Sequence, residues 1–118
     1  MENVRIVRGE IMLPPGELPS QAAEVAVYVE DVSRADAPSL VIGEQRQQGV
    51  SLSAGGVLHF EVQLPSVLID ERRTYAVRAH VDMSGSGEVK VGDLVSTETY
   101  PVLTRGYGTA ARMRVRRV

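Results

Sequence analysis

The stretch EVAVYVEDVSRADAPSLVIGEQ, residues 24–45, decides the fold class of this chain. In its first part Val25, Val27 and Val29 occupy alternate positions, and residues spaced by two lie on the same face of a β-strand. A polar segment follows and ends at Pro38, which disfavours helix in the residue before it. An apolar run resumes two residues later, so the stretch predicts two strands joined by a turn.

Similar alternating segments recur along the chain, separated by clusters of Gly, Pro, Ser and Asp. This pattern predicts an all-β fold, a single-domain antiparallel β-sandwich of about seven to eight strands over residues 1–118. A chain of 118 residues has room for one hydrophobic core. The predicted strands are Val4–Leu13, Glu24–Asp31, Ser39–Glu44, Val57–Leu64, Tyr75–Asp82, Glu88–Thr97, Tyr100–Leu103 and Ala111–Val118.

Several details of the connections can also be predicted. The apolar residues at the start of the first predicted strand fall on the opposite face from those that follow, so we expect a bulge near Ile6. Residues 45–56 are polar and contain glycines, which indicates a connection with room for a short strand at residues 50–52. The segment Ser66–Arg73 is expected to be a crossover with one helical turn. The loop Met83–Gly87 is rich in Gly and Ser, so we expect a mobile hairpin connection there.

Composition excludes several classes of protein. Thirteen basic against 15 acidic residues give a net charge of −2, which argues against a nucleic-acid partner. With no cysteine, the chain has no disulfide, thiolate metal site or thiol nucleophile. The N-terminal residues lack the apolar core of a signal peptide, and no run of 18 apolar residues is present. The chain as given is therefore expected to be soluble.

No catalytic or metal-binding motif is evident. The two histidines, His59 and His80, are predicted on outward faces of strands that could be neighbours, but a zinc site needs three or four protein ligands. Solvent-facing imidazoles are the favoured interpretation. The sequence contains no GxSxG, HExxH or SxxK motif. We therefore predict no catalytic residue, no metal and no cofactor, and no enzymatic activity.

The last predicted strand carries the strongest local charge. Arg112, Arg114 and Arg116 alternate along it and are expected to share one outward face. Such a row could meet an acidic partner or anionic lipid headgroups, with salt-sensitive attraction. The favoured interpretation is a charged strand that resists edge-to-edge pairing.

Exposed aromatic residues suggest further contacts. Tyr28 is predicted on an outward face and Tyr107 in a turn, but without tryptophan the chain lacks the flat aromatic platform that glycan-binding sandwiches use. The candidate interaction surface predicted from the sequence comprises Tyr28, Arg78, His80, Tyr107, Arg112, Arg114 and Arg116.

Four segments in order along the chain resemble a known family: LPP at residues 13–15, VEDVSRADAP at 29–38, IDERRTYAVRAHV at 69–81 and TYPVLTRG at 99–106. Together they resemble the YbaY and YscW type of bacterial lipoprotein, described as type III secretion system lipoprotein chaperones. The resemblance implies a small β-sandwich and a non-enzymatic accessory protein of the Gram-negative envelope. The better described relatives act as pilotins, which help an outer-membrane secretin reach its place or assemble, and many other members have no assigned role.

The family's lipobox and acylated cysteine are not in the sequence given. We expect a chain that begins after the anchor, located in the cell envelope or periplasm, with membrane contact only through a lipid anchor absent from this chain. A native start at Met1 would instead make the protein cytoplasmic. The leading hypothesis is an envelope module that binds another protein, such as an outer-membrane secretin. The alternative is a sandwich that binds a small ligand or glycan, and a hydrolase ranks last.

Overall fold

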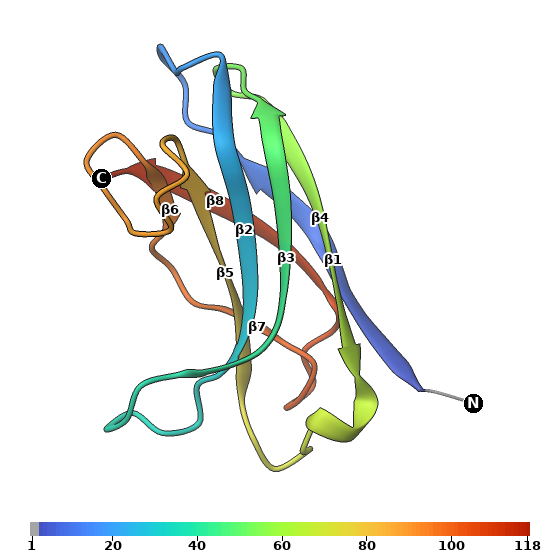
Figure 1. Cartoon of the computed structure of the whole chain (residues 1–118). Helices are drawn as coiled ribbons and strands as arrows, with labels where there is room; N and C mark the ends of the chain where they lie inside the picture. Colours follow the sequence, from blue (N-terminus) through green and yellow to red (C-terminus); the bar gives the residue numbers. More distant parts are fainter. Residues whose placement is uncertain (1–2) are drawn as a thin grey trace.

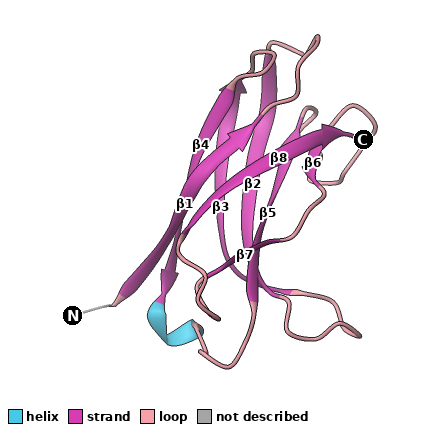
Figure 2. Ribbon diagram, turned by 180° about the vertical axis from the view of Figure 1, so that it is seen from behind, coloured by secondary structure: helices cyan, strands magenta, loops and turns pink. Residues whose placement is uncertain are grey.

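The computed structural model describes residues 3–118 and consists almost entirely of β-strands (Figure 2). A single turn of 3-10 helix, Ser66–Leu68, lies in the crossover where one helical turn was predicted. The strands are β1 (Val4–Met12), β2 (Gln21–Asp31), β3 (Leu40–Ser51), β4 (Val57–Pro65), β5 (Tyr75–Asp82), β6 (Leu94–Ser96), β7 (Tyr100–Val102) and β8 (Ala110–Arg117). The prediction of an all-β fold is confirmed.

The sheet is mixed and nearly closed, which differs from the predicted antiparallel sandwich. Strands follow the order β3-β2-β5-β6-β8-β1-β4, with β7 added to β5. Every pair is antiparallel except β1 and β8, which run parallel. The strands β2, β3 and β5 form one layer, and β1, β4 and β8 form the layer behind it (Figure 1). Strands β3 and β4 end the order, and their outer edges, which pair with no strand of residues 3–118, lie close together.

The core lies between the two layers and follows the predicted alternation. Tyr75, Val77, Ala79 and Val81 of β5 are all buried, as are Phe60, Val62 and Leu64 of β4. Met113 and Val115 of β8 complete the core from the opposite layer. The phenol of Tyr75 accepts a hydrogen bond from the backbone N–H of Asp70 at 2.9 Å, so its buried polar atom has a partner. Burial of these apolar side chains is the main stabilising contribution to the fold.

The predicted bulge near Ile6 is wrong. The pairing of β1 with β4 keeps one register from Val4 to Met12, and the register shift lies instead between Val29 and Glu30 in the pair of β2 with β3. Gly9 permits close packing at the parallel pair, because a Cβ at this position would lie 1.7 Å from the carbonyl oxygen of Ala111. The face on which the apolar residues fall therefore does not locate the register shift.

Two predicted boundaries also need correction. Strand β3 does not end at Glu44 but continues to Ser51, since residues 45–51 pair with β2 despite their polar character. The predicted strand Glu88–Thr97 is reduced to β6, and residues 83–93 form a loop. The mobility of Met83–Gly87 stays a prediction. Among the described residues, no helix is both long and apolar enough to cross a bilayer.

Candidate functional site

Tyr28 and Arg78, two residues of the predicted surface, lie together on the outer face of the layer formed by β2, β3 and β5. They are direct cross-strand partners, and the Cζ atom of Arg78 lies 4.2 Å from the centroid of the Tyr28 ring. Arg46 of β3 approaches the same ring at 5.7 Å. Guanidinium groups over an aromatic face are attracted by the ring quadrupole. Tyr28 is therefore held between two cations.

Acidic residues surround this arrangement. The Nε atom of Arg78 lies 2.9 Å from a carboxylate oxygen of Glu30, and Arg46 forms an ion pair with Glu24. The hydrogen bond from Gln48 and the contact with Arg46 hold the pKa of Glu24 below its ordinary value. We call Tyr28, Arg46, Arg78, Glu24 and Glu30 the Tyr28 cluster. Because its charges are paired, it presents a preorganised polar surface with little net charge.

His80 does not lie on the surface, so the prediction that placed it there is wrong. It projects from the outer face of β5 as expected, but only 4% of it is exposed because the loop 83–93 covers it. Its Nε2 atom lies 2.8 Å from Oδ2 of Asp93. His59 and His80 are also not neighbours, since β4 pairs with β1 whereas β5 pairs with β2, β6 and β7.

Two buried carboxylates hold this loop in place. Asp82 accepts hydrogen bonds from the N–H groups of Gly85 at 2.8 Å and Gly87 at 2.9 Å. Asp93 accepts from the N–H groups of Met83 at 3.0 Å and Lys90 at 3.1 Å. We call His80, Asp82 and Asp93 the loop clamp. Both of its carboxylates satisfy backbone donors that no strand pairs.

The clamp is electrostatically favourable despite its burial. Burial acts to raise the pKa of Asp93, but hydrogen bonds from His80, Met83 and Lys90 outweigh it and leave the pKa below the ordinary value. The pKa of Asp82 is lowered in the same way, against burial, by the N–H groups of Gly87 and Gly85. One ligand atom from each clamp residue lies within 4.8 Å of the others, which is close enough for a cation. Hydrogen bonds already account for this geometry, so we interpret the clamp as structural.

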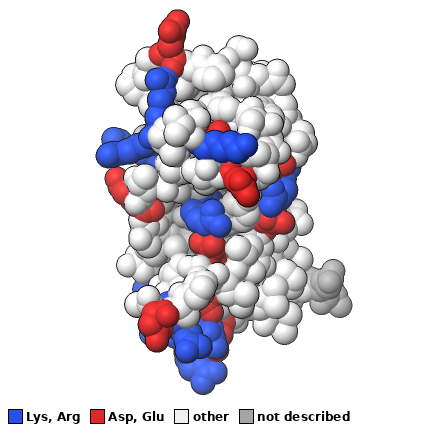
Figure 3. Space-filling view, turned by 60° about the vertical axis from the view of Figure 1, so that its left-hand side comes forward, with Lys and Arg blue, Asp and Glu red and all other residues white. Residues whose placement is uncertain are grey.

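The arginine row points outward as predicted, but its strand is not an edge. Arg112, Arg114 and Arg116 are exposed on β8, which pairs with β1 on one side and β6 on the other. The interpretation that the row protects a sheet edge is therefore wrong. Arg112 forms an ion pair with Glu10 at 3.1 Å. Acidic and basic side chains lie next to one another on the face viewed in Figure 3, with uncharged surface between the groups.

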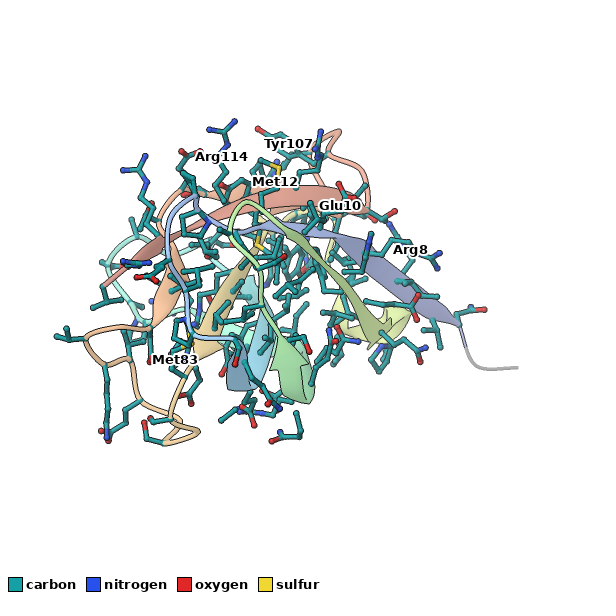
Figure 4. The ribbon with its side chains drawn as sticks, turned by 90° about the horizontal axis from the view of Figure 1, so that it is seen from above. Arg8, Glu10, Met12, Met83, Tyr107 and Arg114 are labelled. Carbon is teal, nitrogen blue, oxygen red and sulfur yellow. The ribbon has the colours of Figure 1, made fainter. Side chains whose placement is uncertain are left out.

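The predicted surface residues thus fall on opposite layers. Arg114 lies on the same upper side of the molecule as Tyr107 and as Arg8 and Glu10 of β1 (Figure 4). Tyr107 is 51% exposed. Tyr28 and its cluster belong to the other layer. No single binding face unites the predicted residues.

Two glutamines in the segment whose composition predicts a connection form a further site. Gln47 of β3 donates from Nε2 to the carbonyl oxygen of His59 on β4, at 2.9 Å. Gln45 accepts through Oε1 from the N–H of Glu61, at 2.8 Å. We call these two side chains the glutamine latch, because they join the two end strands where no backbone pairing exists among the described residues. The only sequence signal was the spacing of Gln45 and Gln47 by two.

A depression of about 490 Å³ opens beside the glutamine latch. It is lined by Gln45 of β3, residues 59–61 of β4 and residues 8–10 of β1. Arg8 and Glu61, cross-strand partners that both line it, form an ion pair at 3.3 Å. Most of its lining residues are polar or charged, although about half of the lining surface is apolar, whereas a typical small-molecule site is predominantly apolar and encloses most of its ligand.

The fold is a small β domain with a mixed sheet. Side-chain hydrogen bonds and ion pairs between its strands are its main surface features. The family model for the type III secretion system lipoprotein chaperone, YscW, matches residues 2–115. The chain belongs to this family. The comparison with curated proteins found no match.

A solved structure is similar over nearly the whole chain. It is described as an alternative pilotin from the type II secretion system of Vibrio cholerae, with a TM-score of 0.80 and 25% sequence identity. The similarity covers 98% of this chain and 98% of that one. The family predicted from four short segments is therefore confirmed, and the similarity extends to the whole fold.

Proposed function

We propose that this protein is a non-enzymatic, pilotin-like chaperone that binds an outer-membrane secretin in the bacterial envelope. The observation that carries the proposal is the family match over residues 2–115, supported by the similarity to an alternative pilotin over 98% of both chains. The family description concerns type III secretion and the similar structure concerns type II secretion. The proposal therefore specifies the kind of partner and leaves the type of secretion system open.

The surface is consistent with protein binding. The Tyr28 cluster offers an aromatic ring and two arginines, residue types that are enriched at the centres of protein interfaces. The exposed arginine row offers a second contact on the opposite layer. The proposed partner contacts therefore lie on both layers, with Tyr28 and Arg78 on one and Arg112, Arg114 and Arg116 on the other. Envelope location follows from the same proposal.

The experiment is co-expression with the outer-membrane secretin of the same bacterium. We expect the secretin to co-purify with this protein, and the yield of assembled secretin in the outer membrane to rise at least severalfold when the protein is present. This protein and an unrelated β-domain of similar size, the control, are both produced behind the same added lipoprotein anchor. Equal secretin assembly with both proteins, together with no co-purification, would overturn the proposal.

A further inference from the structure

The glutamine latch occupies positions that a neighbouring strand would fill. In a parallel pair, one residue donates its N–H to the carbonyl of residue i−1 and accepts from the N–H of residue i+1 on the other strand. The latch reproduces this pattern around Phe60, since Gln47 donates to the carbonyl of His59 and Gln45 accepts from the N–H of Glu61. The amide nitrogen of Gln47 also lies 3.3 Å from the amide oxygen of Gln45. Two side-chain amides thus imitate one residue of a parallel strand.

The backbone of β4 has further groups on the same edge. In a strand the N–H and C=O of one residue point to the same side, and successive residues alternate between sides. His59 and Glu61 both reach toward β3, so the N–H of His59 and the carbonyl of Glu61 also face it. No strand among residues 3–118 pairs with this edge. The edge can therefore form more hydrogen bonds than the latch supplies.

We call the space between the end strands β3 and β4, which the glutamine latch bridges, the slit. We propose that the slit accepts an extended segment of the partner polypeptide, which runs parallel to β4 and displaces the glutamine latch. The proposal rests on the proposed function and adds a main-chain binding site to the side-chain contacts proposed above. The segment pairs with β4 on one side and antiparallel with β3 on the other, so the sheet becomes closed. Main-chain hydrogen bonds of this kind are a common mode of peptide recognition.

The side chains around the slit define the segment's chemistry. A residue opposite Phe60 shares its face and points toward the buried Phe60 and Val62. Residues on either side of it point outward, beside His59 and Glu61 and their neighbour Arg8. The segment should therefore alternate apolar and polar side chains over about five residues.

One end of the slit resists opening. A Cβ at Gly43 would lie 2.0 Å from Cδ2 of Leu64, so β3 and β4 are in tight contact there. The latch, in contrast, consists of neutral side-chain hydrogen bonds, and the carbonyl of His59 that accepts one of them is exposed. Two strand spacings, about 9.6 Å, must separate β3 and β4 once a strand is inserted. The segment therefore enters at the latch, and the contact of Gly43 with Leu64 limits its length.

Two pairs of variants of the complete protein test the proposal. The binding probes are the purified secretin and a set of overlapping synthetic peptides, each about fifteen residues long, that together cover the secretin sequence. The double variant Gln45→Ala, Gln47→Ala removes the competing amides, and binding should tighten about fivefold or more. Gln21→Ala is the matched control, because Gln21 is an exposed glutamine of β2 that belongs to neither the latch nor the Tyr28 cluster. His59→Pro removes an N–H that faces the slit, and binding should weaken at least tenfold. His59→Ala controls for loss of the imidazole.

Hydrogen exchange supplies a readout that does not depend on folding of the variants. When the probe binds, exchange at the N–H of His59 should slow at least tenfold, whereas the N–H of Phe60, which already faces β1, should change little. If the secretin binds but each variant matches its control and exchange at His59 is unchanged, the strand proposal is overturned and the proposed function stands. Helical circular dichroism of the bound peptide, or a dimer of this chain paired through β4, would also overturn it. Absence of secretin binding would overturn both proposals.

Discussion

The loop clamp and the glutamine latch both use side chains where strand pairing is missing, but they differ in charge and burial. His80, Asp82 and Asp93 are buried and charge-assisted, and each carboxylate receives hydrogen bonds from at least two backbone N–H groups. Gln45 and Gln47 are neutral and partly exposed. A buried charge that loses its partner is costly, whereas water can replace a partner of an exposed amide. The comparison indicates a permanent element in the clamp and a displaceable one in the latch.

Replacement of Asp93 should produce the largest effect. Asp93→Ala leaves His80 and the N–H groups of Met83 and Lys90 without their acceptor, so we expect a loss of about 3 kcal/mol in the free energy of unfolding. Urea denaturation of both proteins measures the difference. Asp36→Ala, at an exposed position, is the control and should change stability by less than about 0.5 kcal/mol. A similar small change for Asp93→Ala would contradict the clamp as a permanent element.

Acid should weaken the clamp before the latch. Asp82 and Asp93 have pKa values below the ordinary value in the folded protein, so their contribution is complete above the pKa of about 3.9 in the unfolded chain and is lost as pH falls through the lower folded value. Asp93→Asn should cost about 2 kcal/mol at pH 7, and the difference from the unmodified protein should shrink as pH falls below about 4. Urea denaturation at a series of pH values measures this. A difference that is constant down to pH 2 would mean that the carboxylate charge does not stabilise the clamp.

The sequence predicted the strands with a regular apolar and polar alternation well, but it did not predict the loop clamp or the glutamine latch. In Val57–Leu64 and Tyr75–Asp82 the period-two pattern identified the buried face, because one apolar layer lies directly over these residues. The burial of His80 depends on Asp93, thirteen residues further along, and a contact at that distance leaves no local periodicity. Gln45 and Gln47 are typical of a connection by composition, and pairing with β2 overrides that preference.

The sheet topology could likewise not be predicted from local sequence patterns. The parallel pair of β1 and β8 joins the two ends of the chain, so its register cannot be inferred from either strand alone. Its most specific local sign is Gly9, where an added Cβ would meet the backbone of Ala111. The four segments that resemble the family identified it correctly, although they do not include the latch. Family resemblance and site location therefore rest on different residues.

The tight end of the slit should respond to added volume. Gly43→Ala places a methyl group against the side chain of Leu64, and we expect a loss of about 1 kcal/mol, since Leu64 must shift in a packed core. Thermal and urea denaturation measure the change. Gly108→Ala is the matched control, because no atom lies within 4 Å of the added Cβ. Equal stability of the two variants would show that β3 and β4 are loose at both ends, and the contrast between the tight end and the latch would fail.

The smallest effect on stability should come from the latch itself. In the double variant Gln45→Ala, Gln47→Ala the carbonyl of His59 and the N–H of Glu61 lose their side-chain partners. The first of these hydrogen bonds is exposed and the second is only partly buried, so water can solvate the freed groups. We therefore expect a loss of less than about 1 kcal/mol in the free energy of unfolding, well below that of Asp93→Ala. Urea denaturation gives the total, and hydrogen exchange at Glu61 shows whether its N–H becomes accessible without unfolding of β4. A loss as large as that of Asp93→Ala would make the latch a permanent part of the fold, and a partner could then displace it only by unfolding the edge.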